Sequence, residues 1–157
     1  MTKKASLLLL IYFSVISTGQ AMSIFDAGKV CTFSAVRATV TYEGKPVKGA
    51  KVTRLTDWNT PSTDMTTTNE NGYFELPSLY ERSISRVVLP IQFAVSQVIT
   101  VEYNGQSNEI WVNTKMKPEE NSELGGIPIN LKCELSNEMK TYRVSGPILG
   151  TICTWEQ

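Results

Sequence analysis

The sequence predicts an all-β protein: a single antiparallel β-sandwich of about seven to nine short strands, with at most one short helical turn. Two observations lead to this fold class. Short runs rich in Val, Ile, Thr, Tyr and Phe recur from residue 30 onward, and Gly, Pro and Asn separate them. No stretch of that region has the periodicity of an amphipathic helix of ordinary length. The length of 157 residues suits one domain.

The expected strands follow one another with turn residues between them. In the first, Val36, Ala38 and Val40 alternate with polar residues, as a half-buried strand requires. Asn104 and Gly105 predict a hairpin because both tolerate positive φ. Residues 79–90 are ambiguous and could include a helical turn around residues 80–85, and residues 117–126 form a charged loop. The expected strands cover residues 33–42, 50–55, 65–69, 73–78, 96–103, 109–114, 129–135, 141–144 and 151–155.

The first 21 residues have the pattern of a cleaved signal peptide. Lys3 and Lys4 precede an apolar run, and small residues at positions 19 and 21 fit cleavage after Ala21. The run is shorter than a transmembrane helix, so we expect no stable membrane insertion after cleavage. Residues 22–157 then form the β-sandwich domain of a periplasmic or secreted protein. Translation from Met22 would instead give a cytoplasmic form.

Charge and cysteine content narrow the classes of partner and compartment. Without the signal peptide, 13 basic and 15 acidic residues remain, a net charge of −2, and the basic residues are scattered. We therefore expect no nucleic-acid partner. Three cysteines allow at most one internal disulfide. Cys133–Cys153 is the expected pair, Cys31 is a rival partner for either, and three reduced, buried thiols are the alternative.

The absence of histidine excludes catalytic relays and metal sites that depend on histidine. Neither a Ser-His-Asp nor a Cys-His relay can form within the chain, and no histidine can ligate zinc or copper. The cysteines lack metal-binding spacing, and no phosphate-binding glycine loop is present. We expect a protein that is not an enzyme and that needs no cofactor and no metal.

Two segments carry a resemblance to a known fold. GKPVKGAKV at residues 44–52 and TTTNENGYFELPSL at residues 66–79 are similar to transthyretin-like, carboxypeptidase-regulatory-type β-sandwiches. The resemblance covers residues 34–80 and implies the sandwich architecture. Transthyretin-like enzymes that hydrolyse hydroxyisourate depend on histidines, so this chain departs from their pattern.

A closer resemblance extends over nearly the whole mature chain. KVCTFSAV, AKVTRLTDWN, NGYFELPSLYER, KPEENSELGG, LKCEL and TICTW together resemble an uncharacterised bacterial family classed as a domain of unknown function. The resemblance implies no particular activity.

The sequence offers a set of candidate partner-binding residues at strand ends and in the charged loop. Trp, Tyr and Arg are common anchors at protein interfaces, whereas Arg–carboxylate pairs also pin loops together. The alternative to a binding role is therefore structural, with Arg54 or Arg82 pairing with Glu81 or Glu120. Trp111 and Trp155 are expected to pack in the core or on a sheet face. The candidates are Arg54, Asp57, Trp58, Asn59, Tyr80, Glu81, Arg82, Glu119 and Glu120.

These observations favour a non-catalytic exported module that binds a protein partner. A periplasmic immunity protein that neutralises a toxin from a neighbouring bacterium is one alternative. A carbohydrate- or cell-wall-binding module is the other, and it requires at least two of Trp58, Trp111 and Trp155 to be exposed and coplanar.

Overall fold

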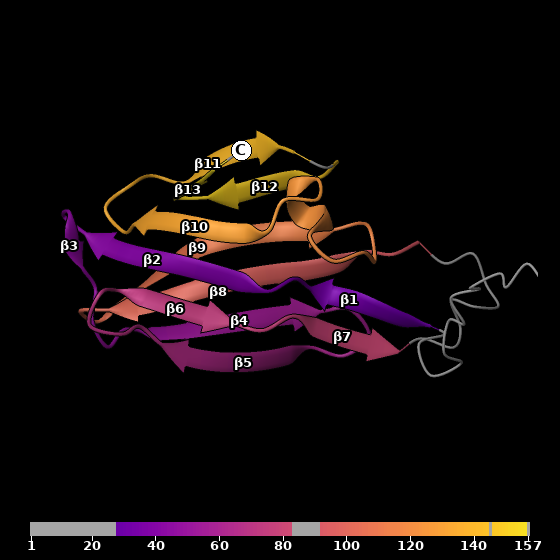
Figure 1. Ribbon diagram of the computed structural model, residues 1–157, viewed down its shortest axis with the longest axis horizontal. Helices are drawn as coiled ribbons and strands as arrows, with labels where there is room; N and C mark the ends of the chain where they lie inside the picture. Colours follow the sequence, from indigo (N-terminus) through magenta and orange to yellow (C-terminus); the bar gives the residue numbers. More distant parts are fainter. Residues whose placement is uncertain (1–27, 83–91, 145, 157) are drawn as a thin grey trace, which may run out of the picture.

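The computed structural model describes residues 28–82, 92–144 and 146–156. Within them the chain is all-β, as expected, but it forms thirteen strands in three sheets rather than one sandwich of seven to nine strands (Figure 1). The strands are β1 (Lys29–Phe33), β2 (Val36–Tyr42), β3 (Lys45–Pro46), β4 (Lys51–Asp57), β5 (Ser62–Thr67), β6 (Tyr73–Leu76), β7 (Leu79–Arg82), β8 (Val95–Tyr103), β9 (Gln106–Lys115), β10 (Ile129–Glu134), β11 (Lys140–Arg143), β12 (Ile148–Thr151) and β13 (Cys153–Trp155). A 3-10 helix, η2 (Ser122–Leu124), lies between β9 and β10.

The three sheets differ in size and strand direction. The largest has the order β11-β12-β9-β8-β4-β5, and we call it the six-stranded sheet. The second, the five-stranded sheet, has the order β13-β10-β2-β3, with β6 also paired to β2. Strands β1 and β7 form a separate pair. One feature corrects the expected all-antiparallel arrangement: β10 pairs with β2 in parallel, because the long β9–β10 connection returns the chain in the direction of β2.

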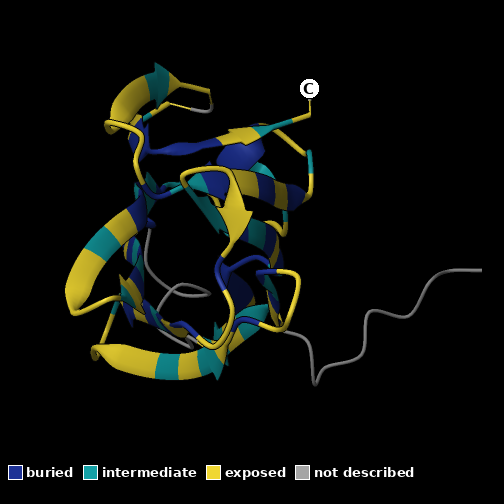
Figure 2. Cartoon of the chain, turned by 90° about the vertical axis from the view of Figure 1, so that its left-hand side faces the viewer, coloured by how far each residue is buried: buried dark blue, intermediate teal, exposed yellow. Residues whose placement is uncertain are grey.

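The two larger sheets pack their apolar faces against each other. Val36, Ala38 and Val40 of β2 face inward as predicted, and Ile99 and Trp111 meet them from the six-stranded sheet. Exposed and buried residues alternate along the strands in Figure 2, which is the period-two pattern of half-buried strands. The prediction that Trp111 packs in the core is confirmed, since its side chain is fully buried.

Several local predictions can be compared directly with the structure. The Asn104–Gly105 hairpin between β8 and β9 is confirmed, with both residues at positive φ. The helical turn considered around residues 80–85 is wrong for residues 80–82, which belong to β7 because they pair with β1. The rest of that segment lies outside the described residues. Of strand β1, the expected strands include only Phe33.

The expected disulfide is confirmed. Cys133 and Cys153, 20 residues apart, are bonded and lie opposite each other in the β10–β13 pair. Cys31 is a buried free thiol in β1. No helix among the described residues is long and apolar enough to cross a membrane. The predicted signal peptide, residues 1–21, lies outside the described residues.

Candidate functional site

Of the candidate residues in and just after β4, some are buried inside the molecule and others are exposed on its surface. Arg54 is fully buried, whereas Asp57 and Asn59 are exposed. Trp58 is half-buried and packs edge-on against Phe93, with ring centroids 5.5 Å apart. The alternation of β4 explains this separation, because neighbouring side chains point to opposite faces. Residues 54–59 therefore do not form one binding cluster.

Arg54 has a structural role, with partners other than those expected. Its Nε and Nη2 donate to the two carboxylate oxygens of Asp64 on β5, at 2.9 and 2.6 Å. Its Nη1 donates to the carbonyl of Pro77 at 2.7 Å, and the guanidinium lies over the ring of Phe33. Neither Glu81 nor Glu120 pairs with it in the described structure. The bidentate pair with Asp64 fixes β5 to the core, and the hydrogen bond to Pro77 fixes the β6–β7 connection.

Tyr80 and Glu120, 40 residues apart in sequence, are brought together. The Tyr80 hydroxyl donates to Glu120 Oε2 at 2.9 Å, and the Ser78 hydroxyl donates to Glu120 Oε1. These hydrogen bonds, Ser78's first, hold the pKa of the Glu120 carboxyl below its ordinary value. Lys29 lies over the Tyr80 ring, 4.6 Å from its centroid. The contact fastens the β9–β10 connection to β7.

The other candidates remain dispersed. Glu81 is half-buried opposite Val30, and Arg82 is exposed opposite Lys29 at the end of the β1–β7 pair. Glu119 is exposed, and its main-chain carbonyl accepts a hydrogen bond from Lys115. Among the described residues, Glu119 and Glu120 line one surface concavity with Lys117 and Ser122, and the other candidates do not line it.

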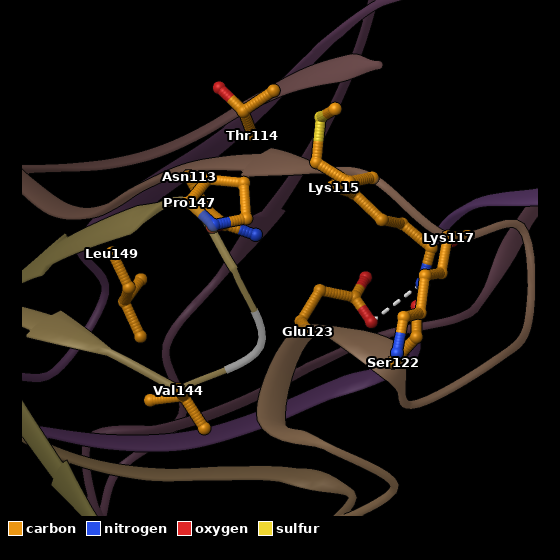
Figure 3. Close-up of a pocket in the computed structure, with 10 residues that line it drawn as sticks. Asn113, Thr114, Lys115, Lys117, Ser122, Glu123, Val144, Pro147 and Leu149 are labelled. Atoms are coloured by element: carbon orange, nitrogen blue, oxygen red, sulfur yellow. Dashed lines mark hydrogen bonds and ion pairs between the residues drawn. The ribbon is translucent and has the colours of Figure 1, made fainter. Parts of the chain in front are cut away.

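A buried ion pair near these residues was not predicted. The side chains of Lys115 on β9 and Glu123 on η2 have no exposed surface, and Lys115 Nζ lies 2.7 Å from Glu123 Oε2 (Figure 3). Lys115 also donates to Ser122 Oγ and to the Glu119 carbonyl, each at 2.8 Å. Ser34 donates its hydroxyl to Glu123 Oε2 at 2.7 Å. Every ammonium proton of Lys115 thus has an acceptor.

The environment of Glu123 keeps its carboxyl ionised. Burial by itself raises the pKa, but the Lys115 ammonium and the hydrogen bonds from Gln97 and Ser34 outweigh it, so the pKa of Glu123 is lowered. The adjoining cavity, lined by Lys115, Glu123 and Leu149 among others, measures about 10 Å³. That volume is about enough for one water molecule. The network therefore positions the loop and leaves no room for a substrate.

A larger concavity lies on the outer face of the five-stranded sheet. It measures about 520 Å³ and crosses four neighbouring strands, β6, β2, β10 and β13. We call it the outer groove, and it is lined by Arg37, Thr39, Tyr73, Asn130, Lys132 and Trp155, with further residues between them. Among the described strands β13 pairs only with β10, so one side of the groove ends at an open strand edge.

One end of the outer groove is held by a cross-strand group of three side chains. Arg37 Nε and the Tyr73 hydroxyl each donate to the Glu75 carboxylate, at 3.1 Å in both cases. The hydrogen bonds from Arg37 and then from Tyr73 hold the pKa of Glu75 below its ordinary value. Lys132 pairs with Glu156 on the opposite side. Both cations are exposed and already neutralised, so the groove favours no single sign of charge.

Comparison with known proteins places the chain in a family without giving it an activity. Residues 36–138 match the model of an uncharacterised family, described as a domain of unknown function, DUF6795. The chain belongs to this family. No curated protein and no solved structure matches it.

The DUF6795 match covers most of the outer groove and the whole ion pair between Lys115 and Glu123. It runs from β2 to beyond β10 and stops before β11. The disulfide partner Cys153 and the aromatic residue Trp155 therefore lie outside the matched residues. The family resemblance seen in the sequence is confirmed at this level.

The outer groove was missed because its residues are far apart in sequence. Arg37, Tyr73 and Asn130 belong to three strands, and the parallel β10–β2 pair that joins two of them has no local sequence signal. The buried ion pair did have a local sequence signal, because Lys115 follows Trp111 and Asn113 at the inward positions of β9. A lysine in an inward register indicates a buried partner.

Proposed function

We propose that this DUF6795 protein is a non-catalytic module that binds a protein partner in the outer groove. The single observation that carries the proposal is the groove itself, about 520 Å³ across four strands. On its outer face it offers Tyr73 and Arg37, residue types enriched at protein interfaces, and Trp155, which packs against Tyr142, borders it at the β13 edge. Arg37 is already oriented by Glu75, so less side-chain entropy is lost on binding.

The character of the lining favours a protein segment over an anionic polymer. Thr39, Asn130 and Thr154 provide small polar side chains between the aromatic residues. Each cation of the groove has an acidic neighbour on the same sheet. An extended peptide could pair with the open edge of β13 while its side chains rest in the groove.

The carbohydrate alternative lacks a specific supporting observation. Trp111 is fully buried, so it cannot belong to an exposed aromatic platform. Trp58 and Trp155 are half-buried, and each packs edge-on against another ring, Phe93 and Tyr142 respectively. A sugar-binding face would need flat, exposed rings.

We infer that the protein works in an oxidising compartment outside the cytoplasm. The Cys133–Cys153 disulfide and the signal-like residues 1–21 support this inference. Mass spectrometry of the protein from a periplasmic extract, without reductant, tests it. A mass that begins at Met22 and is two hydrogens lighter than the reduced chain is expected, whereas a reduced cytoplasmic protein would contradict export.

One more specific proposal is that the bound partner is a toxin, which this protein neutralises. A second proposal concerns the fold: the protein is related to transthyretin-like β-sandwiches. The toxin role is supported only by the small, exported, cofactor-free profile. The kinship is supported by residues 34–80, a stretch that contains β2 to β6. A toxin partner would lose its activity at one equivalent of this protein.

Photo-crosslinking in the native cell tests the binding site. A benzoylphenylalanine at Thr39 or Asn130, both in the groove, should give the same single adduct. The same group at Ser96, an exposed outward position of β8 on the other sheet, serves as the control. Adducts that do not differ between the two faces would argue against the groove.

The purified partner then gives a quantitative test by calorimetry. Arg37→Ala should weaken binding at least tenfold, because the oriented anchor is lost. Lys51→Ala is the matched control, since Lys51 forms an equally exposed cross-strand pair with Glu102 on the six-stranded sheet. Equal effects of the two variants would contradict the proposal.

A further inference from the structure

The edge strand β5 lacks the features that keep sheet edges from pairing. Thr68 donates its amide to the carbonyl of Ala50, toward β4. Because amide directions alternate along a strand, Ser62, Asp64 and Thr66 also face β4. The amides and carbonyls of Thr63, Met65 and Thr67 therefore point to the free edge. No strand among the described residues pairs with that edge.

Three other edge strands of the described sheets, β11, β3 and β13, each limit pairing with a second sheet in a way that β5 does not. β11 carries the exposed charges of Lys140 and Arg143, β3 contains a proline, and β13 has only three residues. In β5 the one charged side chain, Asp64, pairs with the buried Arg54. Met65, by contrast, is 64% exposed, the most exposed large apolar residue of the described chain. β5 follows the lower side of the molecule in Figures 1 and 2, and most of its residues are exposed.

We propose that two copies of this chain associate through their β5 strands, antiparallel about a two-fold axis at Met65. The residues whose amides face the free edge read the same in both directions: Thr63, Met65, Thr67. In this register Thr63 lies opposite Thr67 of the second copy, and the two Met65 side chains meet on the outer face. The same patch thus serves both copies, as a two-fold interface requires.

Charge supports this register. Asp64 lies opposite Thr66 of the second copy, so no like charges face each other. The pairing forms about six main-chain hydrogen bonds and joins the two six-stranded sheets into one. Both free edges are consumed at once, so association stops at the dimer. The groove on the five-stranded sheet stays free, and the proposal is thus independent of the proposed binding function.

Sedimentation of the purified, oxidised protein over about 1 µM to 1 mM tests the dimer, since a small interface associates weakly. Met65→Lys should weaken association at least tenfold because it places two ammonium groups opposite each other. Met139→Lys is the matched control: Met139 is also an exposed methionine, 43% exposed, and lies away from β5. It should leave association unchanged. Circular dichroism checks that both variants fold.

Disulfide trapping tests the register. Met65→Cys should oxidise to a covalent dimer, because paired residues in this position have Cα atoms about 5.5 Å apart. Thr63→Cys should not link to itself but should link to Thr67→Cys when the two variants are mixed. A monomer at every concentration, a dimer that Met65→Lys leaves intact, assembly beyond two copies or a cross-link of Thr63→Cys to itself would each overturn the proposal.

Discussion

At the scale of single residues, the charges inside this protein hold segments together. Lys115 and Glu123 are buried with all partners supplied, and Arg54 is buried against Asp64. Glu134 holds two segments together near the surface. Its carboxylate accepts hydrogen bonds from the main-chain amides of Glu43 and Gly44 in the β2–β3 turn. Buried ion pairs such as Lys115–Glu123 contribute little net stability but are costly to break singly.

Lys115→Met should destabilise the protein by about 3–5 kcal/mol, because it leaves the Glu123 carboxylate buried without its counter-charge. Urea denaturation measures the loss. Lys132→Met is the matched control, since the Lys132–Glu156 pair is exposed, and its effect should stay within about 0.5 kcal/mol. Adding Glu123→Leu to Lys115→Met should recover part of the loss. Equal effects of the two single variants would contradict a role for the buried pair.

The pH dependence of the free energy of unfolding should include a contribution from the ionisation of Glu134. Hydrogen bonds from Ser136 first, and from Thr41 and Gly44, lower the pKa of this carboxyl from 4.5 to about 2. Since the folded pKa is the lower one, the stabilisation is present above about pH 4.5 and is lost as pH falls toward 2. Glu134→Gln should flatten the stability profile in that window. Parallel profiles for parent and variant, measured by urea denaturation, would show that this residue does not contribute.

At the scale of elements, turns and connections decide which sheet each strand joins. Strand β5 belongs to the six-stranded sheet and β6 to the five-stranded sheet, so residues 68–72 carry the chain across. Gly72 makes that crossing possible: its amide and carbonyl bond Asn69 and Val40, and its φ is +72°. A Cβ there would lie 2.2 Å from the Val40 carbonyl oxygen.

Gly72→Ala should therefore disturb the junction between the crossing and β2. The clash with the backbone adds to the cost of a left-handed conformation, about 1–2 kcal/mol. Gly49→Ala is the matched control, because Gly49 has φ of +69° but no atom within 4 Å of the place a Cβ would occupy. The difference in free energy of unfolding between the two variants isolates the clash, and similar values would refute it.

At the scale of the whole molecule, the last strands close the fold. The chain crosses from the six-stranded to the five-stranded sheet at Ile152, between β12 and β13, and the disulfide then fixes β13 to β10. Trp155 packs against Tyr142 of β11, with ring centroids 5.0 Å apart, across the seam between the sheets. The C-terminal segment thereby forms one wall of the outer groove.

Replacing Cys133 and Cys153 by serine should lower the free energy of unfolding by about 3 kcal/mol, the effect of closing a loop of this length. Reductant should weaken the parent protein similarly and leave the double variant unchanged. Denaturation with and without reductant measures both effects. A variant as stable as the oxidised parent would mean that packing alone holds β13 in place.

Local patterns determined much of this protein. Alternation in residues 36–40 fixed which face of β2 is buried, Asn104–Gly105 fixed a hairpin, and the cysteines in two late strands indicated the disulfide. These features depend on neighbours in the chain, so period and turn chemistry suffice to predict them. The missing histidine likewise limits the chemistry whatever the fold.

Only the tertiary structure decided the parallel β10–β2 pairing, the burial of Arg54 and Lys115, the outer groove and the open edge of β5. Each depends on contacts between residues distant in sequence. Arg54 illustrates the reason: the sequence allowed either a surface anchor or a pair with Glu81 or Glu120, but strand register directs it inward to Asp64 and Pro77. Composition and local pattern leave open which strands become neighbours, and that choice determines which side chains meet.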